Sequence, residues 1–93
     1  MATDTVVMYS TPYCPYCMAA RFLLKKKAVD YQDINVSTDA NLRAEMEQRS
    51  GRYTVPQIFI GDTHVGGYDD LNALEVAGDL DKLLGNRETA QET

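Results

Sequence analysis

The chain has 93 residues, the length of one domain, and 44% of them are hydrophobic, which is enough to form a core without a covalent crosslink. Its formal net charge is −5, whereas a broad nucleic-acid-binding face needs a surplus of Lys and Arg. No apolar stretch approaches the roughly 20 residues that span a bilayer, and the first residues lack the basic and apolar regions of a secretion signal. We therefore expect a cytoplasmic protein that binds neither nucleic acid nor membrane.

The first half of the sequence alternates the patterns of strands and helices. Residues 5–9 are largely apolar and β-branched, which predicts a buried strand. After a loop, Pro15 suits the first turn of a helix, and residues 17–27 carry apolar side chains at helical spacing. Residues 29–36 then alternate apolar and polar side chains, which predicts a second strand. The inward face of the expected helix consists of Ala20, Leu23, Leu24 and the stem of Lys27.

A second helix and a β-hairpin are expected in the middle of the chain. The Ser-Thr-Asp run at residues 37–39 supplies helix caps, and Gly51 ends the helix after Ser50. Residues 56–60 and 63–65 predict two short strands around a Gly-Asp turn, and together they form a hairpin. The stripe on the helix consists of Leu42, Met46 and Arg49, and the residues expected to pack within the sheet are Met8, Ile58 and Phe59.

A third helix, started by Asp69 or Asp70, follows two glycines and is interrupted by Gly78, with a last turn over residues 79–84. The predicted order of elements is β-α-β-α-β-β-α. The β-α-β unit gives parallel strands, and the hairpin adds antiparallel strands to the same sheet. We predict an α/β protein with a four-stranded mixed sheet flanked by helices. One domain should cover residues 1–85, with a polar tail over residues 86–93. The apolar residues of the third helix are Leu71, Leu74 and Val76.

Cys14 and Cys17 are the only cysteines, and both lie at the junction between the first strand and the first helix. Helix N-termini expose free N–H groups and the positive end of the helix dipole, and both favour a thiolate. Cys14 is therefore the expected nucleophile. Cys17 lies one turn further on the same face, and a disulfide between them can close where the helix end adjusts.

Other roles for the two cysteines are open from the residues alone. A structural disulfide would close a very short loop, which constrains the unfolded chain weakly. A zinc site closed by cysteines needs four ligands, and this chain offers two cysteines and the distant His64, which we expect to be structural or solvent-facing. An iron–sulfur cluster shared between two chains is another alternative. In a reducing cytoplasm, Cys-X-X-Cys within a β-α-β pattern favours thiol–disulfide exchange.

The only basic run, Lys25 to Lys27, falls where the first helix should end. Its simplest interpretation is that it complements the negative end of the helix dipole. A patch that receives an acidic partner is the alternative.

Three motifs carry a family resemblance. CPYC at residues 14–17, TVPQIFI at residues 54–60 and GGYDDL at residues 66–71, in this order and at these separations, resemble the glutaredoxins, above all the small bacterial dithiol members. The resemblance covers roughly residues 5–84 and implies the thioredoxin fold. It also implies that Cys14 attacks disulfides, that Cys17 resolves the mixed disulfide, and that glutathione reduces the resulting bond.

The resemblance further implies how glutathione is held. Pro56 should be cis and should turn the backbone of Val55 toward the ligand, as in strand addition. The γ-glutamyl end is expected at Tyr68 and Asp69, with Asp70 next to them, because free N–H groups at a helix start bind a carboxylate and an Asp carboxylate binds an amine.

The glycyl carboxylate of glutathione requires a cation at the other end. Many relatives carry a lysine where this chain has Thr11, so Arg43 is expected to contribute more, and Arg52 is a further candidate. The full set of expected glutathione contacts is Thr11, Tyr16, Arg43, Thr54, Val55, Pro56, Gly67, Tyr68, Asp69 and Asp70.

The sequence is thus interpreted as a glutathione-dependent thiol–disulfide oxidoreductase that reduces protein disulfides and protein–glutathione mixed disulfides. Glutathione is the co-substrate and no metal is expected. The resemblance implies a monomer that donates electrons to cytosolic reductases, ribonucleotide reductase among them. The alternatives are a thioredoxin-like donor reduced by a flavoprotein, and an iron–sulfur carrier in which Cys14 and bound glutathione hold a cluster between two chains.

Overall fold

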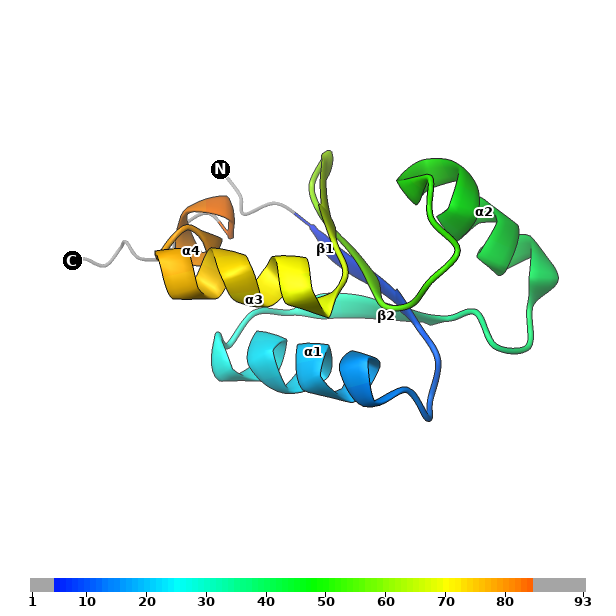
Figure 1. Ribbon diagram of the computed structural model, residues 1–93, viewed down its shortest axis with the longest axis horizontal. Helices are drawn as coiled ribbons and strands as arrows, with labels where there is room; N and C mark the ends of the chain where they lie inside the picture. The colour runs from blue at the N-terminus through cyan, green and yellow to red at the C-terminus, as the bar shows by residue number, and fades with distance from the viewer. Residues whose placement is uncertain (1–4, 85–93) are drawn as a thin grey trace.

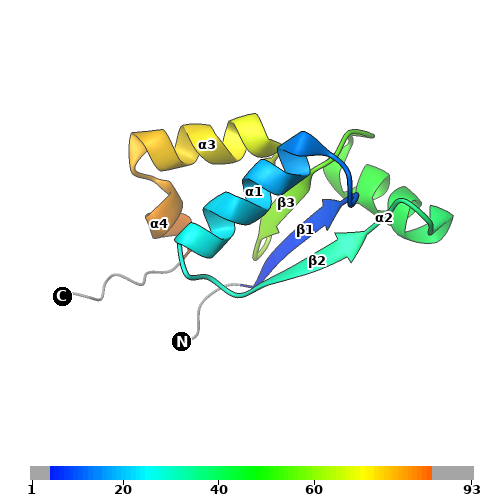
Figure 2. The ribbon, with the colours of Figure 1, turned by 90° about the horizontal axis from the view of Figure 1, so that it is seen from below.

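The computed structural model describes residues 5–84, and it has the predicted order of elements with a short helix at the end. A four-stranded sheet lies between helices on both of its faces (Figures 1 and 2). The expected polar tail at residues 86–93 lies outside the described residues. The elements are β1 (Val6–Ser10), α1 (Pro15–Lys26), β2 (Tyr31–Asn35), α2 (Ala40–Ser50), β3 (Gln57–Ile60), β4 (Thr63–Gly66), α3 (Tyr68–Ala77) and α4 (Leu80–Leu83).

The strands lie in the order β2-β1-β3-β4 across the sheet. β1 and β2 are parallel, with Val6 opposite Tyr31, as a β-α-β unit requires. β3 is antiparallel to β1 and forms the predicted hairpin with β4. The mixed sheet and the implied thioredoxin fold are therefore confirmed. Because β1 is an inner strand, the cysteine loop that follows its carboxyl end lies near the middle of that end of the sheet.

Each face of the sheet has its own hydrophobic core. α1, α3 and α4 cover one face and α2 covers the other (Figure 2). Met8 and Ile58 lie in the first core and Phe59 in the second, all of them buried, as the alternation of side chains along a strand requires. Other buried residues of the first core are Val6, Ala20, Leu23, Leu24, Val29, Ile60, Leu71, Leu80 and Leu84; those of the second are Tyr9, Val36 and Met46.

Met46 is the only buried residue of α2. A cluster of polar side chains also attaches this helix to the sheet. The hydroxyl of Tyr9 donates to Glu45 Oε2 at 2.5 Å and accepts from Arg49 Nη1 at 2.6 Å. The Arg49 guanidinium also lies over the ring of Phe59, 4.3 Å from its centroid. The expected stripe on α2 thus packs inward at Arg49 through hydrogen bonds and a cation–π contact.

The ends of the first two helices follow the sequence signals. Asp39 caps α2 by accepting hydrogen bonds from two backbone N–H groups, and Gly51 ends this helix with a left-handed φ of 71°. Lys25 and Lys26 occupy the last turn of α1. Lys27 follows them, and its Nζ lies 2.6 Å from Glu75 Oε1 in α3.

Two expectations for the third helix were wrong. Its N-cap is Gly67, and Asp70 reaches back from the first turn to accept a hydrogen bond from the Gly67 N–H at 3.0 Å. An aspartate suits both the N-cap, where it accepts from later N–H groups, and the third helical position, where it accepts from the N-cap N–H, so the sequence did not settle the register. Val76 is 79% exposed, because it lies five residues after Leu71 and therefore on another face of the helix.

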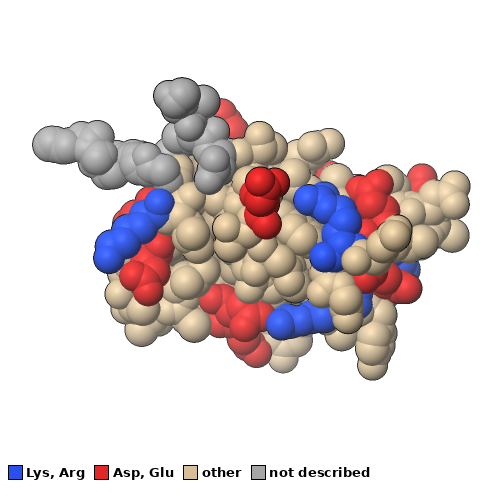
Figure 3. Space-filling model, turned by 90° about the horizontal axis from the view of Figure 1, so that it is seen from above, with Lys and Arg blue, Asp and Glu red and all other residues tan. Residues whose placement is uncertain are grey.

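α1, with 12 residues, is the longest helix in the described part of the chain, and none of the helices there is long and apolar enough to cross a membrane. Cationic side chains on the face shown in Figure 3 lie beside acidic ones. This mixed arrangement is in keeping with the ion pairs within residues 5–84, such as Arg52 with Asp70 and Arg43 with Glu47.

Candidate active site

Cys14 is the N-cap residue of α1, where the chain leaves β1 and turns into the helix. Pro15 takes the first helical position and has no N–H of its own to satisfy. The backbone N–H of Cys17 points back and donates to the Cys14 sulfur at 3.4 Å. A hydrogen bond from a free helical N–H, together with the helix dipole, stabilises negative charge on this sulfur.

Cys17 lies in a different environment from Cys14. Its side chain is fully buried, whereas that of Cys14 is partly exposed. Burial raises the pKa of the Cys17 thiol to about 11, because the interior disfavours the charged form. Of the two sulfurs, only that of Cys14 can be reached directly by a disulfide of another molecule.

The loop before β3 faces the first cysteine. The Val55–Pro56 peptide bond is cis, as the resemblance implied. The Cys14 thiol lies 3.9 Å from the carbonyl oxygen of Val55, to which it donates. Residues more than forty positions apart in the sequence therefore meet at one edge of the sheet.

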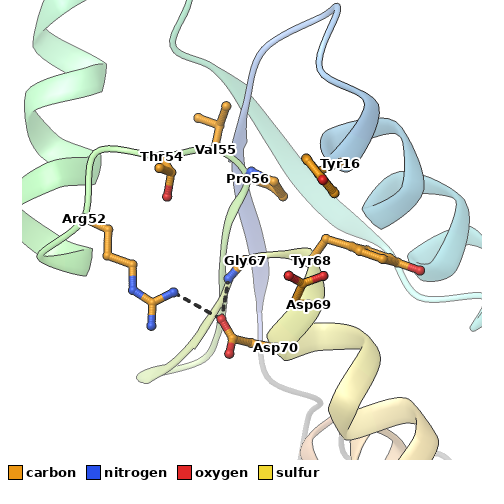
Figure 4. Close-up of a pocket in the computed structure, with 9 residues that line it drawn as sticks. All are labelled: Tyr16, Arg52, Thr54, Val55, Pro56, Gly67, Tyr68, Asp69 and Asp70. Carbon is orange, nitrogen blue, oxygen red and sulfur yellow. Dashed lines mark hydrogen bonds and ion pairs between the residues drawn. The ribbon is translucent and has the colours of Figure 1, made fainter.

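A cleft of about 300 Å³ opens beside this loop (Figure 4). Tyr16 of α1 borders it on one side, the segment before β3 forms its wall, and the start of α3 closes the other side. Eight of the predicted glutathione contacts line it. The lining residues are Tyr16, Arg52, Thr54, Val55, Pro56, Gly67, Tyr68, Asp69 and Asp70.

Two predicted contacts are not among the residues that line the cleft. Arg43 donates from Nη2 to the carbonyl of Tyr53 at 2.7 Å and lies near Glu47. The carbonyl of Thr11 accepts a hydrogen bond from Arg21 on the other side of the cysteine loop. The cation that does line the cleft is Arg52, the further candidate named from the sequence.

The two aspartates at the start of α3 are not equivalent. Asp70 accepts from the Gly67 N–H and pairs with Arg52 at 3.1 Å, and these two contacts lower the pKa of its carboxyl. Asp69 lines the same cleft, and within residues 5–84 it takes part in no ion pair. Its carboxylate is thus available to a cationic group in the cleft.

A support for the cleft wall escaped the sequence reasoning. The buried Gln57 donates from Nε2 to the carbonyl of Thr54 at 3.1 Å, so its oxygen faces His64 Nε2 at 2.7 Å. His64 in turn stacks on the ring of Phe59. The structural interpretation of His64 therefore fits its contacts. The signal that could have found this support is a long polar side chain inside an otherwise apolar strand.

An accessible thiol at a helix start, a buried thiol one turn below it and a cis-proline loop facing them define a thioredoxin-fold protein with a dithiol site. Within the described residues 5–84, no group of three or more His, Cys, Asp or Glu side chains is placed to hold a metal ion.

Known proteins share this arrangement. The family model described as Glutaredoxin matches residues 6–65. A glutaredoxin of Pseudomonas aeruginosa is 57% identical over 79 residues, which cover 85% of this chain and 94% of that protein. The solution structure of glutaredoxin from Brucella melitensis has a TM-score of 0.80 at 52% identity, with 90% of this chain and 91% of that one covered. The crystal structure of a buckwheat glutaredoxin–glutathione complex has a TM-score of 0.80 at 31% identity, with 87% and 76% covered.

The chain belongs to the glutaredoxin family. Members of this family are thiol–disulfide oxidoreductases, and membership gives this chain the same general role.

We predict that Gly66→Ala destabilises the protein more than Gly51→Ala. Both glycines have positive φ, 114° and 71°, but a Cβ at Gly51 meets open space, whereas one at Gly66 would lie 2.8 Å from the Asp70 Cγ. We expect Gly51→Ala to lower the free energy of unfolding by about 1 kcal/mol and Gly66→Ala by roughly 2–3 kcal/mol. Urea denaturation of both variants measures the difference. Equal losses would show that Asp70 is not fixed against Gly66.

Proposed function

We propose that this protein uses glutathione to reduce protein disulfides and protein–glutathione mixed disulfides. The observation that carries the proposal is the position of the Cys14 sulfur, 3.9 Å from the carbonyl oxygen of Val55. Val55 is also one of the residues that line the cleft. A small peptide lying in this cleft would have its own sulfur next to Cys14. The family acts with glutathione, and the buckwheat relative is described as a glutathione complex.

The proposed reaction with a glutathionylated protein needs only Cys14. Its thiolate attacks the glutathione sulfur, a Cys14–glutathione disulfide forms, and the protein thiol leaves as a thiolate that takes a proton from water. A second glutathione thiolate then attacks the glutathione sulfur of this mixed disulfide. Glutathione disulfide departs and the Cys14 thiolate is restored, so the glutathionyl group of the substrate and one free glutathione leave together as a disulfide while the protein sulfur is recovered as a thiol.

Reduction of a protein disulfide also needs Cys17. Attack by Cys14 leaves the substrate joined to the enzyme through one sulfur. Cys17 then loses its proton and attacks the Cys14 sulfur, so that a Cys14–Cys17 disulfide forms and the substrate leaves with its second thiol. Two glutathione molecules then reduce the Cys14–Cys17 disulfide and leave as glutathione disulfide. Because Cys17 is buried directly below Cys14, it can resolve the mixed disulfide without competing for the first attack.

The charges around the cleft suit both ends of glutathione. At the start of α3, backbone N–H groups can bind the γ-glutamyl carboxylate, and Asp69 can bind the adjacent ammonium. Arg52 can bind the glycyl carboxylate, because a guanidinium can donate two parallel hydrogen bonds to a carboxylate. We retain Thr11 and Arg43 as outer contacts for a ligand that extends beyond the cleft.

We further propose that the protein works as a monomer in the cytoplasm, where thiols are kept reduced. Electrons from glutathione would pass through it to cytosolic reductases that form a disulfide in each cycle, and ribonucleotide reductase is the example proposed here.

The two cysteine variants should separate the two reactions. Cys14→Ser should abolish both, whereas Cys17→Ser should keep deglutathionylation and lose most of the reduction of a protein disulfide. Each is assayed with glutathione and glutathione reductase, and in parallel with a flavoprotein thioredoxin reductase as the competing electron source. Activity retained by Cys14→Ser would refute the role of this residue, and faster turnover with the thioredoxin reductase would refute glutathione coupling.

Asp69→Asn should raise the KM for glutathione about tenfold or more, because it removes a charge-assisted contact to the ammonium group. The kcat should change much less, since Asp69 does not touch the reacting sulfur in this scheme. Asp62→Asn is the matched control, because Asp62 lies in the turn between β3 and β4, at the other end of the hairpin from the cleft. An unchanged KM in Asp69→Asn, or an equal rise in Asp62→Asn, would contradict the proposed place of the γ-glutamyl end.

A further inference from the structure

Arg21 links three segments of the chain directly behind the cysteines. Its Nε lies 2.7 Å from Asp33 Oδ2 in β2. Its Nη2 donates to Ser10 Oγ at the end of β1, at 2.9 Å, and to the carbonyl of Thr11 in the following loop, at 3.1 Å. The hydroxyl of Ser10 also donates to Asp33 Oδ1. All the hydrogen bonds of this guanidinium within residues 5–84 therefore go to the middle of β2, to the end of β1 and to the loop that leads into Cys14.

The same loop contacts Cys17. A backbone hydrogen bond from Thr11 is one of the causes that lower the pKa of the Cys17 thiol, and Arg21 donates to the carbonyl of that same residue. Arg21 also lies four positions after Cys17, one turn further along α1. Both the Thr11 hydrogen bond and the positive charge of Arg21 favour the thiolate of Cys17, and they oppose the effect of its burial. Cys14 acts in the opposite direction.

We propose that Arg21 is a positioning residue for the resolving step: anchored by Asp33 and Ser10, it holds the Thr11 amide against Cys17 and places a positive charge behind that sulfur. This inference rests on the proposed role of Cys17. In the step concerned, Cys17 gives up its proton to water and its sulfur bonds to the Cys14 sulfur. The disulfide between Cys14 and the substrate breaks, and the substrate sulfur takes the electron pair and then a proton.

A purely structural role predicts something else. The pair between Arg21 and Asp33 is partly exposed, and such pairs contribute little to stability. Loss of structure would slow both reactions of the enzyme, because both need the Cys14 loop. Loss of support for Cys17 would slow only the reaction in which Cys17 takes part.

The test compares Arg21→Met with Lys25→Met, which removes one positive charge one turn further along the same helix, and with Arg21→Lys, which keeps the charge. For Arg21→Met we expect reduction of a protein disulfide to slow at least about threefold at neutral pH. A rise of one pKa unit lowers the thiolate fraction tenfold, and the greater nucleophilicity of a more basic thiol offsets part of this loss. Deglutathionylation should stay unchanged, Lys25→Met should affect neither reaction, and Arg21→Lys should recover most of the lost rate.

A second measurement does not depend on turnover. In the Cys14→Ser background, the ¹³C chemical shift of the Cys17 Cβ reports the titration of Cys17, and Arg21→Met should shift it to higher pH while Lys25→Met should not. An unshifted titration, or an equal slowing of both reactions in Arg21→Met, overturns the proposal. If the unmodified protein shows no reduction by glutathione, the proposed function fails, but the titration of Cys17 still decides whether Arg21 acts on this sulfur.

Discussion

The hydrogen bond from the Cys17 backbone N–H to the Cys14 sulfur is the interaction on which the rest of the site depends. It exists because α1 begins at Pro15, so that the first free N–H groups of the helix point toward the N-cap residue. The same helix buries Cys17 one turn later. One local structure thus gives a partly exposed sulfur that accepts a hydrogen bond from the helix and a buried sulfur whose pKa is raised. The proposed attacking and resolving roles rest on this difference.

The fold supplies what the helix alone cannot. The inner strand β1 delivers Cys14 to the edge of the sheet, and β3, paired to it, delivers the loop with Val55. This loop is supported from behind, since Gln57 holds Thr54 and is itself in contact with His64. Through the stacking of His64 on Phe59, the support extends to the core beneath α2. The cleft wall is therefore part of the packed sheet and not a free loop.

Much of this could be predicted from the sequence, because the informative signals are local. The signals that mark helix ends lie at those ends in the sequence: the cysteine spacing and Pro15 for α1, and Asp39 and Gly51 for α2. The structure has these helix ends where they were expected. The cap of α3 was misassigned, because Asp70 reaches Gly67 from inside the helix. The contacts of Arg21 and Arg43 join residues from different elements, and Gln57 bonds back to Thr54 and across the hairpin to His64. Neither periodicity nor spacing specifies which group a long polar side chain meets. Arg52 was named as a candidate only because it precedes the proline loop, and the structure places it in the lining of the cleft.

The central claim is that the sulfur of Cys14 is the one that attacks first. It is tested most directly when both cysteines are present and compete. The reduced protein is mixed with one equivalent of glutathione disulfide, quenched with acid at the earliest accessible time, and digested, and the cysteine that carries glutathione is located by fragment mass spectrometry. The account predicts that the early mixed disulfide is on Cys14. Glutathione found first on Cys17, or divided equally between the two residues, would contradict it.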